Sequence, residues 1–386
     1  MKITNVITDS NVGGAGVLVA SVAEALCRDY AIEIIIPRGS ALRGRLAGCG
    51  AAVVELDFSP DKSFNPGDVY TFHRYFLKNS CDILHTHASF SARLGSLGTP
   101  VGARISTRHC AHPTTEVRAM SRPKRRLYDL CTDLTVSTAD FATENLIREG
   151  VARNKIFTLR NGVCAPRRTS DAERAALRES LGIPRHGVIL GSAARLEFVK
   201  GQDLMIRAMK PLLMDFPNLY LLLVGDGSAR SEYERLAARL GVLDRVIFFG
   251  YTPTPATLQN LFYINLNASR GTETSCLATS ECMSLGIPTV ASDFGGNPEM
   301  ILNERNGLLF RTDNPDSLVR AVKRLLSSHE LYRKLSLGAE AIFKSRFSID
   351  IMAEGYRRLY EDSRLRSAAS RRRTRKYKKI DNGLKL

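Results

Sequence analysis

The sequence contains no apolar run long enough to cross a bilayer, and its first residues lack the features of a secretory leader. Residues Met1 to Thr8 have the composition of a short strand, without a basic region followed by a long apolar core. Hydrophobic residues make up 44% of the chain and charged residues 24%, which excludes a disordered or fibrous protein. We therefore expect a cytoplasmic, globular protein.

The sequence also lacks a C-x-x-C pair. Its cysteines are scattered, and several lie within apolar patterns: Cys27, Cys49, Cys81, Cys110, Cys131, Cys164, Cys276 and Cys282. This distribution is typical of buried, reduced thiols in a cytoplasm. Histidines do not supply a metal-ligand pattern either. His85 and His87 fall on one face of a predicted strand, but His109 and His112 add no acidic or thiol partner, so we predict no metal site.

A dinucleotide-binding G-x-G-x-x-G fingerprint is absent as well. The first predicted strand instead ends in a glycine turn, Asp9-Ser-Asn-Val-Gly13-Gly14-Ala-Gly16, which leads into a helix. Glycines there allow backbone to approach a ligand at the helix N-terminus. By itself such a turn is as often structural as functional.

The formal net charge of +16 is the compositional outlier. From Arg364 to Leu386 the chain has ten Lys or Arg and one acidic residue, so this tail supplies nine of those charges. A second cluster comprises Arg122, Lys124, Arg125 and Arg126. The tail fits an anionic bilayer surface or a nucleic acid, or it is a solvated terminus without a partner.

Short β-rich runs alternate with helical patterns, which builds a parallel sheet covered by helices. In the first half the predicted strands are 2–8, 31–37, 52–56, 82–87, 104–108 and 134–137. A second series follows a stretch rich in proline and arginine, with predicted strands at 187–191, 219–225, 245–250, 263–267, 289–292 and 307–310. The sequence thus predicts two doubly wound lobes. Because ligands of such sheets bind at the carboxyl ends of the strands, the site is expected in a cleft between the lobes.

Two carboxylates, Glu273 and Glu281, bracket the start of a predicted helix. Thr274 and Ser275 are candidate N-caps, so the helix start offers backbone N–H groups flanked by acids. A phosphate suits those N–H groups. The carboxylates would repel phosphate and favour neutral hydroxyls instead. A ligand that carries both kinds of group is a nucleotide sugar.

Two cations, Arg195 and Lys200, follow the first strand of the second lobe, and Gly201 comes directly after them. They are placed to neutralise a diphosphate leaving group as its bond to a sugar breaks. Exposed surface cations are the alternative interpretation. His109, at a strand end, is a candidate to hydrogen-bond a sugar hydroxyl, and the alternative is a satisfied structural histidine.

Together these residues resemble the family 4 glycosyltransferases of the GT-B fold over nearly all of residues 1 to 365. The family's Glu-x7-Glu corresponds to Glu273 and Glu281, its Arg-x4-Lys-Gly to Arg195, Lys200 and Gly201, and its Asn-Gly-Val to residues 161–163. Pro298-Glu299 is a further familiar stretch. The family's usual Gly-Phe-Gly or Ser-Phe-Gly type of sequence after the first glutamate is replaced here by Thr274-Ser275-Cys276.

The resemblance implies a GT-B fold of two Rossmann-like lobes and a retaining, metal-independent transferase that uses a nucleotide sugar, such as a UDP- or GDP-sugar, and no cofactor. By resemblance, Arg195 and Lys200 hold the donor diphosphate, Glu281 the ribose and Glu273 the transferred sugar. The remaining implied donor-binding residues are Gly13, Gly14, Thr274, Ser275, Cys276 and Leu277, with His109 near the sugar.

The expected domains are an acceptor-side lobe (1–165), a donor-binding lobe (166–348), a helix crossing back to the first lobe (349–366) and the basic tail (367–386). A saccharide or lipid-linked acceptor at the inner face of a bacterial cytoplasmic membrane, in polysaccharide or lipopolysaccharide synthesis, accords with the basic segments. Two alternatives remain open: a GT-B sugar-nucleotide epimerase, and a protein whose tail binds an anionic surface or nucleic acid. Little aromatic interleaving accompanies the tail, so nucleic acid is not the expected partner.

Overall fold

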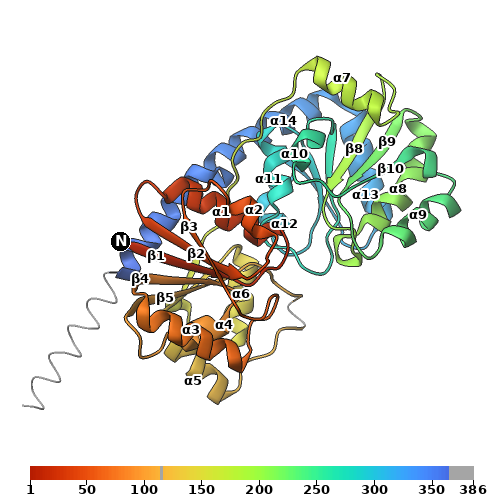
Figure 1. Ribbon diagram of the computed structural model, residues 1–386. Helices are drawn as coiled ribbons and strands as arrows, with labels where there is room; N and C mark the ends of the chain where they lie inside the picture. Colours follow the sequence, from red (N-terminus) through yellow and green to blue (C-terminus); the bar gives the residue numbers. More distant parts are fainter. Residues whose placement is uncertain (114–115, 365–386) are drawn as a thin grey trace, which may run out of the picture.

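The computed structural model describes residues 1–113 and 116–364, and it has two α/β lobes (Figure 1). The first lobe holds a parallel seven-stranded sheet in the order β3-β2-β1-β4-β5-β6-β7. Its strands are β1 (Lys2–Ile7), β2 (Ala31–Pro37), β3 (Ala52–Leu56), β4 (Cys81–His87), β5 (Val101–Arg108), β6 (Leu134–Ser137) and β7 (Ile156–Thr158). Its helices are α1 (Gly14–Leu26), α2 (Leu42–Leu46), α3 (Pro66–Lys78), α4 (Phe90–Gly95), α5 (Arg122–Cys131) and α6 (Asp140–Glu149).

The second lobe holds a parallel six-stranded sheet in the order β10-β9-β8-β11-β12-β13. Its strands are β8 (Val188–Ala193), β9 (Leu219–Val224), β10 (Val246–Gly250), β11 (Ile264–Asn267), β12 (Thr289–Ser292) and β13 (Gly307–Phe310). Its helices are α7 (Asp171–Ser180), α8 (Gln202–Asp215), α9 (Arg230–Arg239), α10 (Pro255–Gln259), α11 (Leu277–Ser284), α12 (Asn297–Met300), α13 (Pro315–Ser327) and α14 (His329–Ile342).

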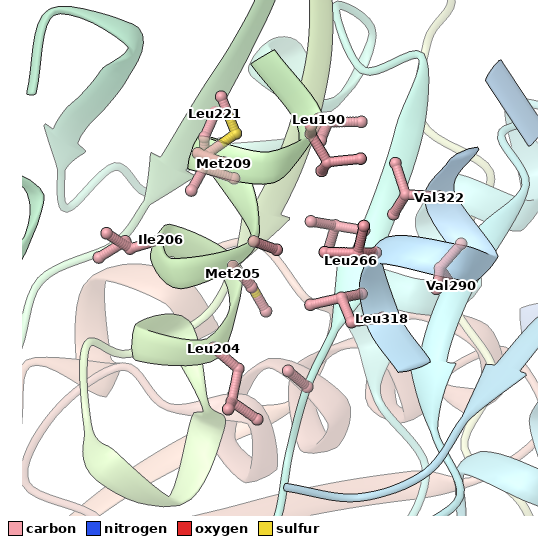
Figure 2. Close-up of a cluster of buried hydrophobic side chains, with 14 of the residues drawn as sticks. Leu190, Leu204, Met205, Ile206, Met209, Leu221, Leu266, Val290, Leu318 and Val322 are labelled. Carbon is pink, nitrogen blue, oxygen red and sulfur yellow. The ribbon is translucent and has the colours of Figure 1, made fainter. Parts of the chain in front are cut away.

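Apolar side chains from the sheet and from two helices form the main core of the second lobe (Figure 2). Met205 and Met209 of α8 and Leu318 of α13 pack with Leu190 of β8 and Leu266 of β11. All five are at most 3% exposed. Continuous apolar strands covered on both faces are typical of parallel sheets. This packing holds the carboxyl ends of β8 and β11 in place, where the loops that carry Lys200 and Glu273 begin.

The two-lobed, doubly wound architecture predicted from the sequence is confirmed. One strand was missed: β7 spans only three residues, and its segment was interpreted as the run leading into the second lobe. A strand this short gives almost no periodic signal, and its place is set by pairing with β6. Pairing with β6 therefore defines this strand, which the local sequence pattern does not predict.

The last described helix, residues 349–364, returns to the first lobe (Figure 1). Met352, Tyr356 and Tyr360 are buried in the apolar cluster of the first sheet. Gly162 permits this crossing, because a Cβ there would lie 2.3 Å from the carbonyl oxygen of Ser348. The predicted basic tail, 367–386, lies outside the described residues.

None of the helices described in residues 1–113 and 116–364 has the length and apolarity needed to span a bilayer. All eight cysteines are unpaired thiols. Cys49, Cys81, Cys131 and Cys282 are buried, but Cys110 and Cys164 are exposed, so the expectation of buried thiols is wrong for those two. Both cysteines lie in connecting segments outside the helices and strands, where an apolar sequence pattern does not predict burial.

Candidate functional site

The glycine turn of the first lobe faces the start of α11 in the second. A Cβ on Gly14, the first residue of α1, would lie 3.9 Å from Cδ1 of Leu277, the first residue of α11. The N-termini of these two helices therefore approach each other between the lobes. Each sits after the carboxyl end of a parallel strand, where α/β sheets bind their ligands.

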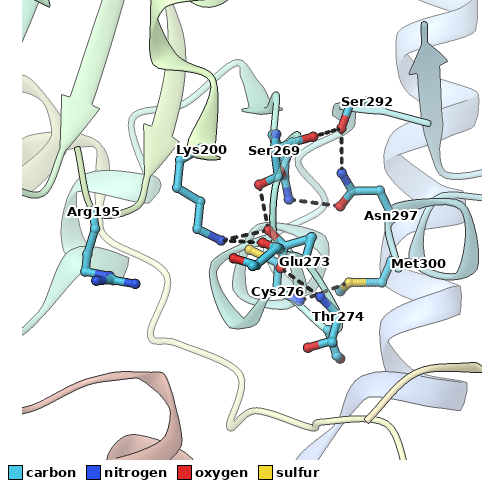
Figure 3. A network of polar contacts seen from close by, with 12 residues as sticks. Arg195, Lys200, Ser269, Glu273, Thr274, Cys276, Ser292, Asn297 and Met300 are labelled. Atoms are coloured by element: carbon cyan, nitrogen blue, oxygen red, sulfur yellow. Dashed lines mark hydrogen bonds and ion pairs between the residues drawn. The ribbon is translucent and has the colours of Figure 1, made fainter. Parts of the chain in front are cut away.

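Lys200 and Glu273 form a buried ion pair at this position (Figure 3). The Nζ of Lys200 lies 3.0 Å from Oε2 of Glu273, and the two side chains are 20% and 6% exposed. The hydroxyl of Ser269 donates to the same carboxylate oxygen at 2.7 Å. Burial disfavours the charge on Lys200, but attraction to Glu273 outweighs it, so the pKa of Lys200 is above its ordinary value. Lys200 therefore keeps its positive charge at neutral pH.

Close backbone approaches at three glycines fix the position of this pair. Gly201 has φ of 69°, and a Cβ there would lie 2.1 Å from the carbonyl oxygen of Ala268. Gly296 lies against Thr274, where a Cβ would be 1.7 Å from its carbonyl oxygen, and Gly295 lies against Glu273. No other residue fits such contacts without moving backbone. Sequence reasoning missed Gly295 and Gly296 as supports, although the Gly-Gly pair itself was a visible signal.

A pocket lies beside the ion pair, with about 280 Å³ of empty space that includes open solvent. The lining residues are mostly small or polar: Ser192, Ala193, Ala194, Lys200, Asn265, Leu266, Asn267, Ser269, Glu273, Cys276, Ala278 and Thr279.

Arg195 and Glu281 do not line this pocket. The guanidinium of Arg195 lies 2.7 Å from Glu197, with its side chain 72% exposed, and it stands apart from the Lys200 network in Figure 3. In this arrangement Arg195 therefore pairs with Glu197, and the predicted role of Arg195 and Lys200 together at a donor diphosphate stays a prediction. Glu281 lies on α11, where burial raises the pKa of its carboxyl group and a hydrogen bond with Gln259 opposes that shift.

The predicted N-caps of α11 are wrong. Its N-cap residue is Cys276, with no side-chain cap, and the backbone N–H of Cys276 lies 3.2 Å from the sulfur of Met300. Thr274 instead donates its hydroxyl to the backbone carbonyl of His109 in the first lobe at 2.9 Å. A contact between lobes outcompetes the local cap. The start of α11 thus retains backbone N–H groups without a side-chain acceptor, which suits an anionic ligand.

Buried polar atoms without a hydrogen-bond partner surround the same helix. They include the hydroxyl oxygens of Ser275 and Ser280 and the amide oxygen of Gln259. Buried polar groups in folded proteins are almost always paired, so orphaned ones mark a place for a polar ligand or water. The unpartnered hydroxyl of Thr279, on the same helix, belongs to a residue that lines the pocket.

His109 lies in the first lobe opposite Glu273, and its ring is held by His87 rather than by a metal site. The Nε2 of His109 is 2.9 Å from Nδ1 of His87. Burial lowers the pKa of His109 to about 4, so the ring is neutral at physiological pH. No group of three or more metal-ligating side chains occurs in the part of the chain that the structure describes.

Two sequence families match the chain in tandem. Glycosyltransferase Family 4 matches residues 12–165, and Glycosyl transferases group 1 matches residues 173–342. The D-inositol 3-phosphate glycosyltransferase of Corynebacterium aurimucosum is 26% identical over 326 residues, which cover 77% of this chain and 75% of that protein. The enzyme of the same name from Xylanimonas cellulosilytica is 26% identical over 92% of this chain and 93% of its own.

Solved structures agree in fold. HepE from Anabaena, solved with UDP-glucose, superposes with a TM-score of 0.80 at 19% identity, over 94% of this chain and all of that one. A glycosyltransferase from Rickettsia africae superposes with a TM-score of 0.81 at 19% identity, over 94% and 98%. The fold and the site therefore define a GT-B glycosyltransferase that uses a nucleotide-sugar donor. Within that class, the chain belongs to glycosyltransferase family 4, group 1.

Proposed function

We propose that the protein transfers a hexosyl or N-acetylhexosaminyl group from a UDP- or GDP-sugar to a hydroxyl of a saccharide or lipid-linked acceptor, with retention of anomeric configuration and without a bound metal. The observation that carries the proposal is the buried Lys200–Glu273 pair at the uncapped start of α11. A fixed cation suits a diphosphate, and a fixed carboxylate suits a sugar hydroxyl.

In this mechanism the diphosphate leaves toward Lys200 and the N-terminus of α11, which stabilise its developing negative charge. Arg195 turns from Glu197 to the same phosphates when the donor binds. Glu273 accepts a hydrogen bond from the transferred sugar, and Glu281 one from the ribose. The acceptor hydroxyl attacks from the face that the diphosphate leaves, and a phosphate oxygen takes its proton, so no covalent enzyme intermediate forms.

Product analysis tests this reaction. The purified chain is incubated with a panel of UDP- and GDP-sugars and saccharide acceptors, and the anomeric configuration of the product is determined by nuclear magnetic resonance. We expect a product with the anomeric configuration of the donor and unchanged turnover in EDTA. An inverted product would overturn the same-face mechanism, and loss of turnover in EDTA would overturn metal independence. Cleavage or epimerisation of the donor without acceptor would favour the epimerase alternative.

We further propose that the enzyme acts at the inner face of a bacterial cytoplasmic membrane, on a lipid-linked intermediate of surface polysaccharide or lipopolysaccharide synthesis. The support is α5, which carries Arg122, Lys124, Arg125 and Arg126, all exposed, next to Leu130, which is 64% exposed. Each cation near an anionic surface contributes about 1 kcal/mol. The predicted basic tail adds further charge to the same chain.

Sedimentation with phosphatidylglycerol vesicles tests the membrane proposal. Changing Lys124, Arg125 and Arg126 to glutamate, or removing residues 367–386, should lower the bound fraction. The matched control is Arg333→Glu with Lys334→Glu, two exposed cations on α14 of the second lobe. If the α5 variant and the truncated chain both sediment like the wild type, neither basic segment is a membrane contact.

A further inference from the structure

Three histidines gather at the sheet of the first lobe, and only His109 is among the candidate site residues described above. His85 and His87 lie on β4, and His109 follows β5 by one residue. The rings of His85 and His87 are 4.4 Å apart, and those of His87 and His109 are stacked at 5.1 Å. His85 is fully buried and His87 is 4% exposed.

The strand pattern explains why these rings meet. Alternate residues of a strand face the same side, so His85 and His87 both face the crossing helix, 349–364, whose Tyr356 and Tyr360 lie against His85. His87 pairs in register with Thr107 of β5, which brings His109 beside it. Asn5 of β1 lies on the other side, with its Oδ1 3.2 Å from Nε2 of His87. The result is a hydrogen-bonded row from Asn5 through His87 to His109.

All three imidazoles are neutral. Burial lowers the pKa of His85 to about 3 and that of His109 to about 4, and it lowers the pKa of His87 well below the ordinary value. Neighbouring histidines add to the shift at His85 and His87, since two imidazolium ions side by side repel. A neutral imidazole has one N–H donor and one bare acceptor nitrogen.

The donor and the acceptor of each hydrogen bond in this row follow from its Asn5 end. Oδ1 of Asn5 is an acceptor only, so Nε2 of His87 carries the proton and Nδ1 of His87 is bare. A bare Nδ1 accepts, so Nε2 of His109, 2.9 Å away, is the donor. The neutral ring of His109 therefore has a bare Nδ1. Among the described residues no side chain or backbone group bonds this nitrogen.

The position of His109 indicates what its Nδ1 meets. The backbone carbonyl of His109 accepts the hydroxyl of Thr274, which directly follows Glu273 in the opposite lobe. Residue 109 thus lies at the lobe interface, within one residue of the carboxylate assigned to the transferred sugar. A bare ring nitrogen there accepts a hydrogen bond from a hydroxyl but repels a phosphate oxygen, which has no proton to donate.

We propose that His87 is a positioning residue for sugar transfer: with Asn5 it fixes the tautomer and ring orientation of His109, so that Nδ1 of His109 accepts a hydrogen bond from a hydroxyl of the transferred sugar. The inference rests on the proposed function for its substrate, but the tautomer itself does not depend on any activity. His85 bonds to Thr107 and Tyr360 instead, at 2.6 and 2.9 Å. It has the same burial but no bond to His109, which makes it a matched control.

The tautomer is tested first, in the full-length chain labelled with ¹⁵N-histidine. Ring nitrogens with and without a proton have distinct ¹⁵N resonances, and a His109→Gln variant assigns the signals of His109. We expect a protonated Nε2 and a bare Nδ1 at neutral pH, and a mixture of tautomers in His87→Phe. A protonated Nδ1 in the wild-type chain overturns the proposal, whether or not any sugar is transferred.

Kinetics then test the role of His87. His87→Phe keeps a ring but removes the acceptor, and we expect turnover to fall roughly 10–100-fold, by analogy with removal of the hydrogen-bond partner of a metal-ligating histidine. His87→Asn places an amide oxygen near the position of Nδ1 and should recover much of the turnover. His85→Phe should lower the unfolding midpoint while turnover of the folded enzyme stays near the wild-type value.

Donors that lack one hydroxyl give the sharpest readout. The deoxy donor whose missing hydroxyl contacts His109 should react slowly with the wild-type enzyme and lose little more in His87→Phe, because the same hydrogen bond is already absent. Equal, additive losses for every deoxy donor would overturn the role of His87, as would wild-type turnover in a folded His87→Phe variant. A chain that transfers no sugar from any nucleotide would instead refute the proposed function, and the ¹⁵N result would still stand.

Discussion

Glu299 of the second lobe accepts the backbone N–H of Asp140, the first residue of α6 in the first lobe, at 2.8 Å. Its other carboxylate oxygen accepts the N–H of Phe141 at 2.8 Å. The N-cap residue of α6, Ala139, has no side chain that could do this. An acid from the opposite lobe therefore satisfies two N–H groups of α6 and complements the helix dipole, with Arg160 3.1 Å from the same carboxylate.

Replacing Glu299 with alanine should loosen the two lobes from each other. Three charge-assisted hydrogen bonds are lost, and the two N–H groups lose their acceptor while Arg160 keeps Asp140, so we expect a destabilisation of about 1–3 kcal/mol. Glu299→Gln, which keeps one acceptor oxygen, should lose less. Denaturant unfolding measures both. Glu304→Ala is the control, since Glu304 forms a comparable but exposed pair with Arg324 at 2.7 Å. Equal unfolding midpoints for the Glu299 and Glu304 variants would contradict a stabilising contact between Glu299 and α6.

The architecture was predictable because its signals are local. Runs such as Ala31–Pro37 and Thr289–Ser292 have the predicted strand bounds, since a buried parallel strand is a short apolar run ended by turn residues. The helix crossing back to the first lobe was expected only by resemblance.

The contacts of the site were not predictable in the same way. Glu299 meets Asp140 159 residues away along the chain, and Thr274 meets His109 165 residues away. Both contacts are made between the lobes, so the local sequence pattern does not predict them. Threonine is a favourable N-cap residue, but the hydroxyl of Thr274 donates a hydrogen bond to the backbone carbonyl of His109 instead. Residue type thus supported hypotheses about the chemistry of the site, and the folded chain decided which partners meet.

The Lys200–Glu273 pair should contribute to both folding and turnover. Lys200→Met leaves Glu273 buried without its cation, which costs roughly 3–5 kcal/mol in comparable pairs. Adding Glu273→Gln removes that unpaired charge, so the double variant should unfold at a higher denaturant concentration than Lys200→Met. Turnover should stay at least ~100-fold low in both, because stabilisation of the leaving diphosphate is lost.

The control for that series is Lys323→Met, which removes the cation of an ion pair with Asp215 whose side chains are 36% and 52% exposed. It should change stability by less than about 1 kcal/mol and leave turnover intact. A double variant no more stable than Lys200→Met would mean that the buried charge of Glu273 is not what Lys200 compensates.

Arg195 should matter for the donor but not for the fold. Its side chain is 72% exposed and pairs with Glu197 at the surface, so Arg195→Ala should change stability by no more than about 0.5 kcal/mol. Binding of UDP or GDP to this variant, measured by calorimetry, should weaken. Arg195→Lys should bind with intermediate affinity, because the lysine ammonium keeps the charge but cannot form the two parallel hydrogen bonds of the planar guanidinium. Glu197→Gln releases the guanidinium and should not weaken binding. Wild-type nucleotide affinity in Arg195→Ala would show that Arg195 stays with Glu197.

Asp9 should make stability depend on pH in a narrow range. It follows β1 by two residues and lies beside the glycine turn, with its Oδ2 3.7 Å from where a Cβ of Gly13 would lie. Burial, and then repulsion by Asp61, raises its pKa from 3.8 to about 6. Between about pH 4 and 6 the folded chain keeps a proton that the unfolded chain has released, so stability falls as pH rises through this range, and the loss persists above it.

Asp9→Asn removes this titration, and we expect the variant to be more stable than the wild type at pH 7 by about 1–2 kcal/mol, a value reduced for the partial exposure of Asp9. Below pH 4 the two proteins should have similar stability, because Asp9 is then protonated in both states. Thermal unfolding from pH 4 to 7 measures the difference. The exposed Asp362→Asn is the control and should follow the wild-type curve. If Asp9→Asn also follows that curve, burial does not raise the pKa of Asp9 in the folded protein, and the expected pH dependence is wrong.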